Sequence, residues 1–258
     1  MKRAELIESL TRHGVYDLAV VGGGATGLGV ALDAALRGFS VVLLESHDFA
    51  GGTSSRSTKL LHGGVRYLAQ GNLSLVREAL AERATVLRIA PHLAQPLPFV
   101  MPSYRWWQTP FYGLGLKLYD LLAGAAGLGR TEFLSRADTL QALPGVNPDG
   151  LRGGVKYWDG QFDDARLALA LARSAEAAGA RVLNYAEVTG VRQVSGGDHA
   201  LSTLDVRDRR ADAAFQLQAR CVVNATGVWV DALRDHTQPP AHPGTPSRMV
   251  SPSQGVHV

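Results

Sequence analysis

Three glycines and one acid near the start of the chain have the spacing needed to bind a dinucleotide. Gly22, Gly24 and Gly27 follow the pattern G-x-G-x-x-G. In that pattern the first glycine permits a tight turn, the second lets backbone approach a pyrophosphate, and the third lets a helix pack close to a strand. Glu45 follows about 20 residues later, where a carboxylate usually holds ribose hydroxyls. Because this acid would repel a 2′-phosphate, FAD and NAD are both favoured over NADP.

Polar side chains gather in the segment that follows the acid. They are Thr53, Ser54, Ser55, Lys59, His62, Arg66 and Tyr67, with Gly63 and Gly64 between them. Such a segment, beginning at the carboxyl end of a strand, lies where open α/β sheets bind ligands. Histidine is suited to moving protons near neutral pH, and arginine pairs with phosphate or with developing negative charge. From the residues alone, a solvated loop and helix start is an equally good interpretation.

The elements around the glycines must position these groups. Leu18 to Val21 and Ser40 to Leu44 are short apolar runs, typical of parallel strands buried on both faces. Residues 26–37 lack proline and predict a helix that ends at Gly38. Its free N–H groups and positive dipole end would face the pyrophosphate, which adds Ala25 and Thr26 to the candidate contacts. The sequence therefore predicts an adenine dinucleotide site.

Composition bounds the class of protein. The chain has 258 residues, 46% hydrophobic and 19% charged, as in a globular protein. A formal net charge of +3 is too small to indicate nucleic acid binding. The single cysteine, Cys221, excludes an intramolecular disulfide and a cysteine metal site, fits a reducing cytoplasm, and is expected to be buried filler. We expect no metal and no membrane-spanning helix, since no run of 18 apolar residues occurs.

A longer signature resembles one family. The glycine fingerprint continues through Ala31-Leu32-Asp33 to Arg37-Gly38, and residues 53–68 read TSSRSTKLLHGGVRYL. Together they resemble the FAD-dependent glycerol-3-phosphate dehydrogenases, as do residues 78–83 and 90–93. The resemblance favours FAD over NAD. It implies an α/β fold with a Rossmann-like FAD-binding domain of the glutathione-reductase type, beside an antiparallel-sheet α+β substrate domain that is incomplete here.

The same resemblance implies an activity and its partners. The reaction would be oxidation of sn-glycerol 3-phosphate to dihydroxyacetone phosphate, with electrons passed through FAD to a membrane quinone. The protein would be cytoplasmic, or peripheral on the inner face of the cytoplasmic membrane, and a homodimer is permitted. Candidate catalytic residues are His62, Arg66 and Tyr67. Candidate FAD contacts are Gly22, Gly24, Ala25, Thr26, Gly27, Glu45, Thr53, Ser54, Ser55, Lys59, His62, Gly63, Gly64, Val188, Ala225, Thr226 and Gly227.

Several alternatives remain open at this point. A related FAD-dependent amine or amino-acid oxidase would share the dinucleotide half, and a non-catalytic FAD-binding fragment would share the whole chain. His62 is a candidate base, a flavin contact or a structural histidine, and His257 is a second proton-handling candidate. Gln254 stands where the family often has lysine, and Leu28 where a smaller residue is frequent.

The rest of the chain divides into four expected segments. Residues 1–95 and 161–235 would form the FAD-binding domain, 96–160 a substrate or cap segment, and 236–258 the truncated start of a return to the substrate domain. Residues 1–14 are expected to form a short helix or a disordered lead-in. Further expected elements are helices at 74–89 and 162–178, strands at 97–101, 153–160, 182–185, 191–194, 201–206, 215–217 and 220–224, and a proline-bounded turn at 139–148.

Two patterns in this part of the chain have competing interpretations. Adjacent Asp163 and Asp164 do not converge on a helix, so we expect helix capping and not acid/base or metal chemistry. Residues 105–129 are rich in aromatic and leucine side chains, among them Trp106 and Trp107. They predict either a core helix or an interfacial element that contacts a membrane.

Overall fold

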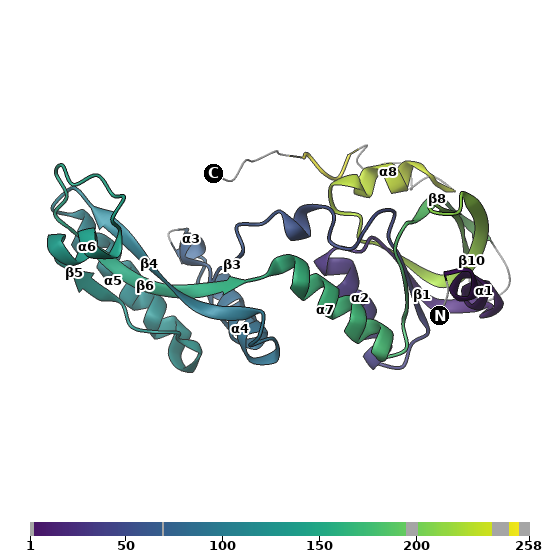
Figure 1. Ribbon diagram of the computed structural model, residues 1–258, viewed down its shortest axis with the longest axis horizontal. Coiled ribbons are helices and arrows are strands. Elements are labelled where there is room, and N and C mark those ends of the chain that lie inside the picture. Colours follow the sequence, from purple (N-terminus) through teal and green to yellow (C-terminus); the bar gives the residue numbers. More distant parts are fainter. Residues whose placement is uncertain (1–2, 69, 195–200, 239–247, 253–258) are drawn as a thin grey trace. The chain divides into compact units, whose positions relative to one another are not determined.

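The chain folds into two compact units in the computed structural model, which describes residues 3–68, 70–194, 201–238 and 248–252 (Figure 1). The first unit comprises Met1–Thr58 and Asp164–Val258, and the second comprises Lys59–Asp163. The division expected from the sequence placed its first boundary near residue 95, which lies inside strand β4 (Ala94–Ser103) of the second unit. Gln254 and His257 lie outside the described residues.

A seven-stranded sheet forms the centre of the first unit. Its order is β11-β8-β9-β10-β1-β2-β7. The strands are β1 (Val15–Val21), β2 (Val41–Leu44), β7 (Arg181–Leu183), β8 (Ala186–Val194), β9 (Leu201–Asp208), β10 (Ala213–Asn224) and β11 (Thr237–Gln238). The parallel pairs of β1 with β2 and β10, and of β2 with β7, make one half, while β8, β9 and the start of β10 form an antiparallel meander.

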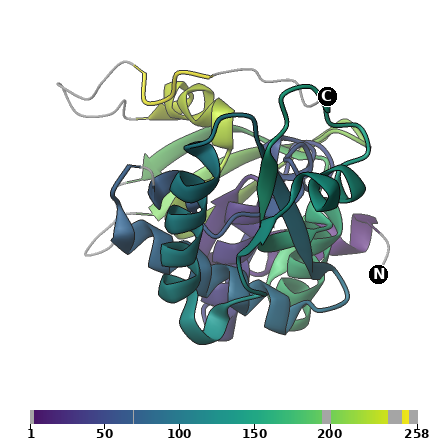
Figure 2. The ribbon, with the colours of Figure 1, turned by 90° about the vertical axis from the view of Figure 1, so that its left-hand side faces the viewer.

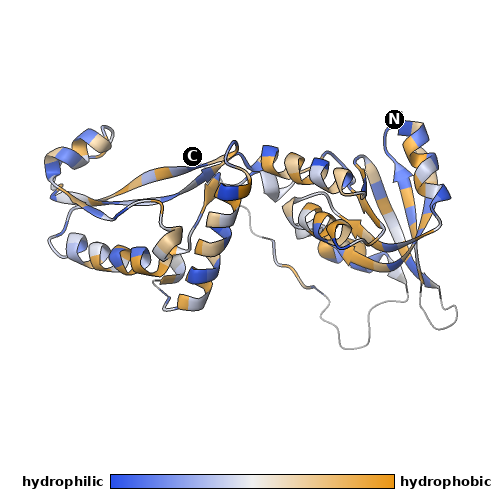
Figure 3. Cartoon of the chain, turned by 90° about the horizontal axis from the view of Figure 1, so that it is seen from below, coloured by the Kyte–Doolittle hydropathy of each residue, from blue (hydrophilic) through white to orange (hydrophobic). Residues whose placement is uncertain are grey.

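Helices cover both faces of this sheet. The helices are α1 (Arg3–Arg12), α2 (Ala25–Leu36), α7 (Asp164–Ala177), α8 (Val230–Asp235) and the short 3-10 helices η1 (Thr53–Ser55) and η3 (Gly227–Trp229). Alternate residues of β1 point to opposite faces. Val20 packs with α2 and α7, whereas Ala19 and Val21 join a second cluster that includes Leu10 of α1 and Leu233 of α8. Figure 3 shows the resulting hydrophobic strands in orange.

Strand β10 is longer than the sequence suggested. We expected separate strands at 215–217 and 220–224, but one strand runs from Ala213 to Asn224. Its first half pairs antiparallel with β9, and its second half pairs parallel with β1. Polar residues such as Gln216 and Gln218 alternate with buried Leu217 and Ala219, which is the pattern of a continuous strand with one face covered.

A smaller antiparallel sheet forms the centre of the second unit. It has the order β3-β6-β4, with β5 also paired to β6. The strands are β3 (Leu60–Leu61), β4 (Ala94–Ser103), β5 (Glu132–Leu134) and β6 (Gly153–Phe162). The helices are α3 (Val65–Leu68), α4 (Leu73–Ile89), α5 (Gln108–Ala123), η2 (Gly124–Ala126) and α6 (Arg136–Ala142). Helices α5 and α6 lie on opposite sides of the sheet (Figures 2 and 3).

Local signals explain where the helices of the second unit begin. Asn72 caps α4 by accepting the N–H of Leu75, which confirms the helix expected at 74–89. Helix α6 corrects the expected turn at 139–148. Ser135 and Asp138 form a reciprocal capping box at its start, a signal at three-residue spacing that outweighs the prolines following the helix.

Candidate functional site

Three parallel strands of the first unit end at the same edge of the sheet. Val21 at the end of β1 pairs with Asn224 at the end of β10 and with Leu44 at the end of β2. The glycine turn, the 225–227 turn and Glu45 follow these strand ends directly. The carboxyl edge of an open α/β sheet is the usual place for a ligand, so the topology assembles the predicted dinucleotide site from three separate stretches of chain.

The glycine turn is too close to its surroundings for larger residues. Gly22 has a φ of +113°, and a Cβ added there would lie 2.4 Å from the carbonyl oxygen of Ala225. A Cβ on Gly27 would lie 1.9 Å from the carbonyl oxygen of Gly22 and 3.3 Å from the Cβ of Ala225. The small residue at 225, a candidate FAD contact, is therefore also needed where the turns pack against each other.

The N-terminus of α2 offers donors for a phosphate. Gly24 is the N-cap and supplies no side-chain cap, and a Cβ there would meet only the Ser54 hydroxyl, at 3.0 Å. The N–H of Ala25 donates to Ser54 Oγ at 2.9 Å. Within the described residues no acceptor takes the N–H of Thr26 or Gly27. Unpaired first-turn N–H groups at a glycine-lined helix start fit a dinucleotide pyrophosphate.

Glu45 is held against the glycine turn. Its Oε2 accepts the N–H of Gly23 at 2.6 Å, and its Oε1 accepts the N–H of His47 at 2.8 Å. Two carboxylate oxygens have about four acceptor positions, so this orientation leaves capacity for ribose hydroxyls. Strand β8 begins beside the same residue, because the N–H of Ala186 donates to the Glu45 carbonyl at 2.8 Å. Val188 lies two residues further along that strand and is half-buried.

The hydroxyl-rich segment joins two helix starts. Ser54, in η1 with Thr53 and Ser55, accepts from the first N–H of α2. Ser57 donates its hydroxyl to Asp164 Oδ2 at 2.7 Å, at the start of α7. Asp164 is buried, so its carboxylate has a tertiary role beyond the capping that the sequence indicated. The segment is therefore ordered by specific partners and is not simply a solvated loop.

The turn after β10 is braced by a residue that the sequence analysis did not single out as a contact. Asn224 Oδ1 accepts the N–H of Thr226 at 3.2 Å and its hydroxyl at 2.7 Å. The Asn224 amide donates to the carbonyl of Val230 at 2.9 Å. Gly227 follows with a φ of +61°, a left-handed conformation that favours glycine. An asparagine that ends a strand before small residues is the local signal for such a braced turn.

Cys221 corrects one expectation, because its side chain is exposed. Its partner across the sheet, Leu18, is only half-buried. The described residues therefore cover the sheet only partly at this pair, where Leu18 packs against the α2 and α7 cluster, and an apolar run in the sequence was not enough to predict burial of Cys221.

The remaining predicted residues lie in the second unit, and β3 sets their positions. Leu61 pairs with Gly160, so His62 follows at the place opposite Asp159. Gly63 passes so close to the core of this unit that an added Cβ would lie 1.7 Å from the Tyr119 hydroxyl oxygen. Gly64 has a φ of +86°. The two glycines after His62 are thus required by packing and by backbone conformation.

Asp159 is a buried acid beneath His62 that the sequence analysis assigned only to a strand and turn. Its Oδ1 accepts from Gly63 N at 2.9 Å, from Arg83 Nη1 at 2.9 Å and from Gly160 N at 3.1 Å. Its Oδ2 lies 3.7 Å from Nδ1 of His62. The side chains of Arg83 and Asp159 are 1% and 5% exposed, whereas that of His62 is 63% exposed.

Two tyrosines surround this buried charge pair. Arg83 Nη1 also donates to the Tyr119 hydroxyl at 3.0 Å. Burial, and then the negative charge of Asp159, raise the pKa of Tyr119 and of Tyr157 above the ordinary tyrosine value. Both hydroxyls therefore stay protonated across the physiological range. The cluster carries one positive and one negative charge inside, with the exposed imidazole at its edge.

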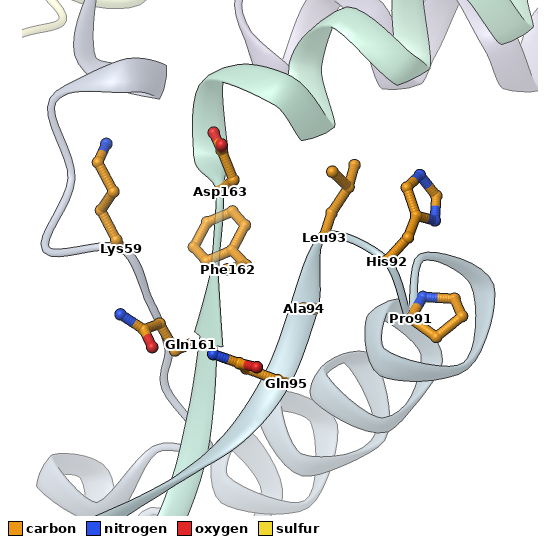
Figure 4. A pocket seen from close by; sticks show the side chains of 9 residues that line it. All are labelled: Lys59, Pro91, His92, Leu93, Ala94, Gln95, Gln161, Phe162 and Asp163. Atoms are coloured by element: carbon orange, nitrogen blue, oxygen red, sulfur yellow. The ribbon is translucent and has the colours of Figure 1, made fainter.

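Lys59 lies at a pocket of about 400 Å³ within the second unit (Figure 4). The pocket is lined by Lys59, Pro91, His92, Leu93, Ala94, Gln95, Gln161, Phe162 and Asp163. Lys59 has a φ of 59°, which is uncommon for a residue with a side chain and often marks functional positions. Its carbonyl oxygen accepts the N–H of Phe162 at 2.9 Å, which anchors the strained residue to β6.

The structure thus brings the predicted residues together in two groups. The first unit collects the glycine turn, the start of α2, Glu45, the hydroxyls of η1 and the 225–227 turn. The second unit contains Lys59, His62, the two glycines and α3, which includes Arg66 and exposed Tyr67. Among the described residues there is no group of three or more His, Cys, Asp or Glu placed to hold a metal ion.

A βαβ unit with a glycine cradle and a terminal acid defines a dinucleotide-binding fold, and comparison with known proteins identifies the family. The model of the FAD dependent oxidoreductase family matches residues 17–258, so the chain belongs to that family. The mitochondrial glycerol-3-phosphate dehydrogenase of Mesocricetus auratus is 43% identical over an aligned stretch of 269 residues, including gaps, that covers 100% of this chain and 36% of that protein. The corresponding protein of Schizosaccharomyces pombe is 42% identical, over 99% of this chain and 41% of its own length.

A solved structure shows the same relation. The glycerol-3-phosphate dehydrogenase from Bacillus halodurans, complexed with FAD, has a TM-score of 0.68 and 34% identity, over 91% of this chain and 38% of that one. The chain therefore spans little more than a third of the length of these relatives. Its cofactor is FAD, and the glycine cradle, the unpaired helix N–H groups and the orientation of Glu45 all fit that group.

Proposed function

We propose that this chain forms the FAD-binding part of a glycerol-3-phosphate dehydrogenase, which oxidises sn-glycerol 3-phosphate to dihydroxyacetone phosphate. The observation that carries the proposal is identity of 43% to such an enzyme along 100% of the chain. The backbone cradle at the start of α2 supports the cofactor half of the proposal. The exposed histidine above a buried carboxylate supports the catalytic half.

The proposed roles follow from what each group can do. FAD, when bound, supplies the two-electron acceptor. The N–H groups of Thr26 and Gly27 would hold its pyrophosphate, and Glu45 its ribose hydroxyls. The η1 hydroxyls, Lys59, Val188 and the 225–227 turn would complete the contacts. At the substrate, Nε2 of His62 would take the hydroxyl proton, while Arg66 would pair with the phosphate and Tyr67 would line the site.

The direct test is an absorption spectrum of the purified protein before and after anaerobic addition of sn-glycerol 3-phosphate. We expect the complete dehydrogenase to show a flavin spectrum that bleaches, with His62→Gln lowering the rate of bleaching about 10²-fold or more while the flavin stays bound. Residues 1–258 alone should show little or no bleaching. His13→Gln is the matched control, because His13 is an exposed histidine of the first unit that stacks on Tyr16. It should bleach at the parent rate.

Three other results would contradict parts of this proposal. Bleaching by an amino acid such as glycine or proline, and not by the phosphate ester, would identify an amino-acid oxidase. Flavin that persists under every substrate would identify a binding fragment without turnover. Absence of flavin would contradict the cofactor cradle itself.

We also propose that α5 contacts the surface of the cytoplasmic membrane from its inner side. One stripe of this helix is buried, at Gly113, Leu116, Tyr119 and Ala123. A second apolar stripe faces outward, where Phe111, Leu114, Leu118 and Leu121 are 67%, 74%, 41% and 77% exposed. Trp106, 77% exposed, precedes it. Exposed leucines with neighbouring tryptophan are typical of interfacial helices. No helix among the described residues could span a bilayer.

Flotation with anionic liposomes tests the membrane proposal. The double variant Leu114→Ser and Leu121→Ser should lose most of the bound fraction. Leu36→Ser is the matched control, because Leu36 is a 71% exposed helix leucine of the first unit and should not change binding. Equal binding by both variants would contradict the proposal. A change of oligomeric state in the double variant would instead assign the stripe to a homodimer.

A membrane quinone is the acceptor that we propose for the electrons. The proposal rests on the similarity to the mitochondrial glycerol-3-phosphate dehydrogenases and on the outward stripe of α5. Reoxidation of the substrate-reduced protein by a short-chain quinone in the absence of oxygen would test it. Failure of quinone to restore the oxidised flavin spectrum would contradict it.

A further inference from the structure

We propose that Asp159 is a positioning residue for His62, with Arg83 holding Asp159 in the orientation that this requires. The pair would keep the imidazole in the tautomer with hydrogen on Nδ1, so that the lone pair on Nε2 can accept a proton. This inference rests on the proposed function only for the use made of Nε2. The tautomer itself is a property of the folded second unit.

The antiparallel register brings the two residues together. Leu61 opposes Gly160, so the next residue along β3 opposes the preceding residue of β6. The Gly63 N–H donates to Asp159 Oδ1 across 96 residues of sequence, which fixes the chain on the far side of His62 as well. The imidazole is therefore attached to backbone that is tied to Asp159 on both sides.

The hydrogen bonds to Asp159 are distributed unequally between its two carboxylate oxygens. Oδ1 accepts three donors, from Gly63 N, Arg83 Nη1 and Gly160 N. Oδ2 faces Nδ1 of His62 at 3.7 Å. That separation is longer than a hydrogen bond, and a small rotation of the exposed imidazole would close it; catalytic pairs are often long before substrate binds.

Burial makes this orientation rigid. Arg83 Nη1 contacts both Asp159 and the Tyr119 hydroxyl, and its Nη2 donates to the carbonyl of Ala126 at 3.1 Å. The side chains of Arg83 and Asp159 are almost fully enclosed. A carboxylate that pairs with a guanidinium has acceptor positions on both oxygens, so Oδ2 presents an acceptor to the imidazole. An acceptor at Nδ1 selects the Nδ1–H tautomer.

Asp159→Asn reverses this preference with little change in shape. Because three donors converge on the Oδ1 position, the amide oxygen of asparagine would remain there and its NH₂ would face His62. A donor at that place favours hydrogen on Nε2, which removes the lone pair needed to accept a proton. The analogous change in serine proteases leaves geometry intact and lowers kcat about 10⁴-fold.

Nitrogen-15 NMR of the histidine side chains measures the tautomer in the 258-residue chain without substrate. His62 is assigned from the signals that disappear in His62→Gln. We expect the Nδ1–H form in the parent and a shift to the Nε2–H form in Asp159→Asn. An Nε2–H form in the parent, or the same tautomer in both proteins, would overturn the proposal.

A second variant separates positioning from loss of stability. Thr139→Val removes a buried hydroxyl that donates to the Ser135 carbonyl at 2.7 Å, within the same unit and outside the Asp159 cluster. It should lower Tm without changing the tautomer. A tautomer shift in this control equal to that in Asp159→Asn would assign the effect to general loosening and overturn the proposal.

Kinetics then tests the use of Nε2. In the active protein, Asp159→Asn should lower kcat about 10²-fold or more with KM nearly unchanged. An unchanged kcat, despite a shifted tautomer, would overturn the catalytic part of the inference. If the parent chain holds the Nδ1–H tautomer but the complete enzyme is not reduced by sn-glycerol 3-phosphate, the proposed function is contradicted and the positioning role is supported.

Discussion

The candidate sites of the two units differ in the atoms that form them: mainly backbone in the first unit and charged side chains in the second. In the first unit the site is formed mainly by backbone, because the glycine turn and the 225–227 turn pack closely together with little side chain between them, and the start of α2 presents N–H groups. In the second unit the site is formed mainly by side chains, because Arg83 and Asp159 form a buried ion pair under His62. A backbone site tolerates no added atom, whereas an ion-pair site tolerates no missing charge. This difference predicts opposite kinds of sensitivity to mutation.

Loss of one charge in the second unit should have the largest effect. Arg83→Met would leave the Asp159 carboxylate buried without a counter-charge, and should lower the free energy of unfolding by about 3–5 kcal/mol. Urea unfolding followed by tryptophan fluorescence, to which Trp158 in β6 contributes, would measure it. The double variant Arg83→Met and Asp159→Asn removes both charges and should recover much of the loss. A single-variant loss below about 1 kcal/mol would contradict the importance of the pair.

The next largest loss of stability should come from one methyl group added in the first unit. Gly27→Ala places a Cβ against the Gly22 carbonyl oxygen, a backbone atom that cannot move aside without opening the turn. We expect a loss of about 2–3 kcal/mol and loss of bound flavin, measured by unfolding and by the flavin absorbance of the purified protein.

The same helix contains the matched control for that change. An ideal Cβ on Gly29 meets nothing within 4 Å. Gly29→Ala should therefore retain flavin and should stabilise the protein by about 0.5–1 kcal/mol, since alanine is the better helix former. Similar flavin loss in both variants would show that the glycine spacing does not define the cradle.

An added methyl group should destabilise the second unit less than the first, because there it contacts side-chain atoms and not backbone. The added Cβ of Gly63→Ala lies against the Tyr119 hydroxyl and 2.8 Å from Leu80 Cδ2. We expect a loss of about 1–2 kcal/mol in urea unfolding. In a Tyr119→Phe background the hydroxyl is absent, so the same change should cost measurably less. An equal cost in both backgrounds would mean that the hydroxyl is not the obstacle.

The smallest effect should come from a charge pair of the first unit that water partly reaches. Arg3 contacts buried Asp208 at 2.7 Å, and its own side chain is 24% exposed. The Arg3 hydrogen bonds, ahead of burial that opposes them, lower the pKa of Asp208 below its ordinary value. We expect Arg3→Gln to lower the free energy of unfolding by about 1 kcal/mol at pH 7.

The pH dependence of that loss has a definite sign. A carboxylate with a lowered folded-state pKa stabilises the protein above the unfolded pKa of about 3.9, and the contribution disappears as pH falls through the folded value. The difference between parent and Arg3→Gln should therefore shrink between pH 5 and pH 3 in denaturant unfolding. A difference that grows on acidification would contradict the assignment to Asp208.

Elements with local signals were predictable. The two apolar runs, the helix after the glycines and the helix capped at Asn72 all occur, because turn chemistry and hydrophobic period act over a few residues. Helix α6 was missed although Ser135 and Asp138 have the spacing of a capping box, because the prolines that follow the helix favour a turn. Asp159 was missed because an acid before a glycine is common in turns, and nothing near it in sequence indicates burial.

Spacing along the chain was enough to place a glycine turn, a helix start and an acid, because these groups lie within about 20 residues of one another and the Glu45 carboxylate contacts the turn directly. The hydrogen bond between Gly63 and Asp159, by contrast, joins residues 96 positions apart, and no spacing along the chain predicts it. Only the antiparallel register of β3 with β6 sets His62 opposite Asp159, and only burial between α4, α5 and the sheet makes the charge of Arg83 necessary. Charges interact through space, so their partners are decided by the fold and not by position in the sequence.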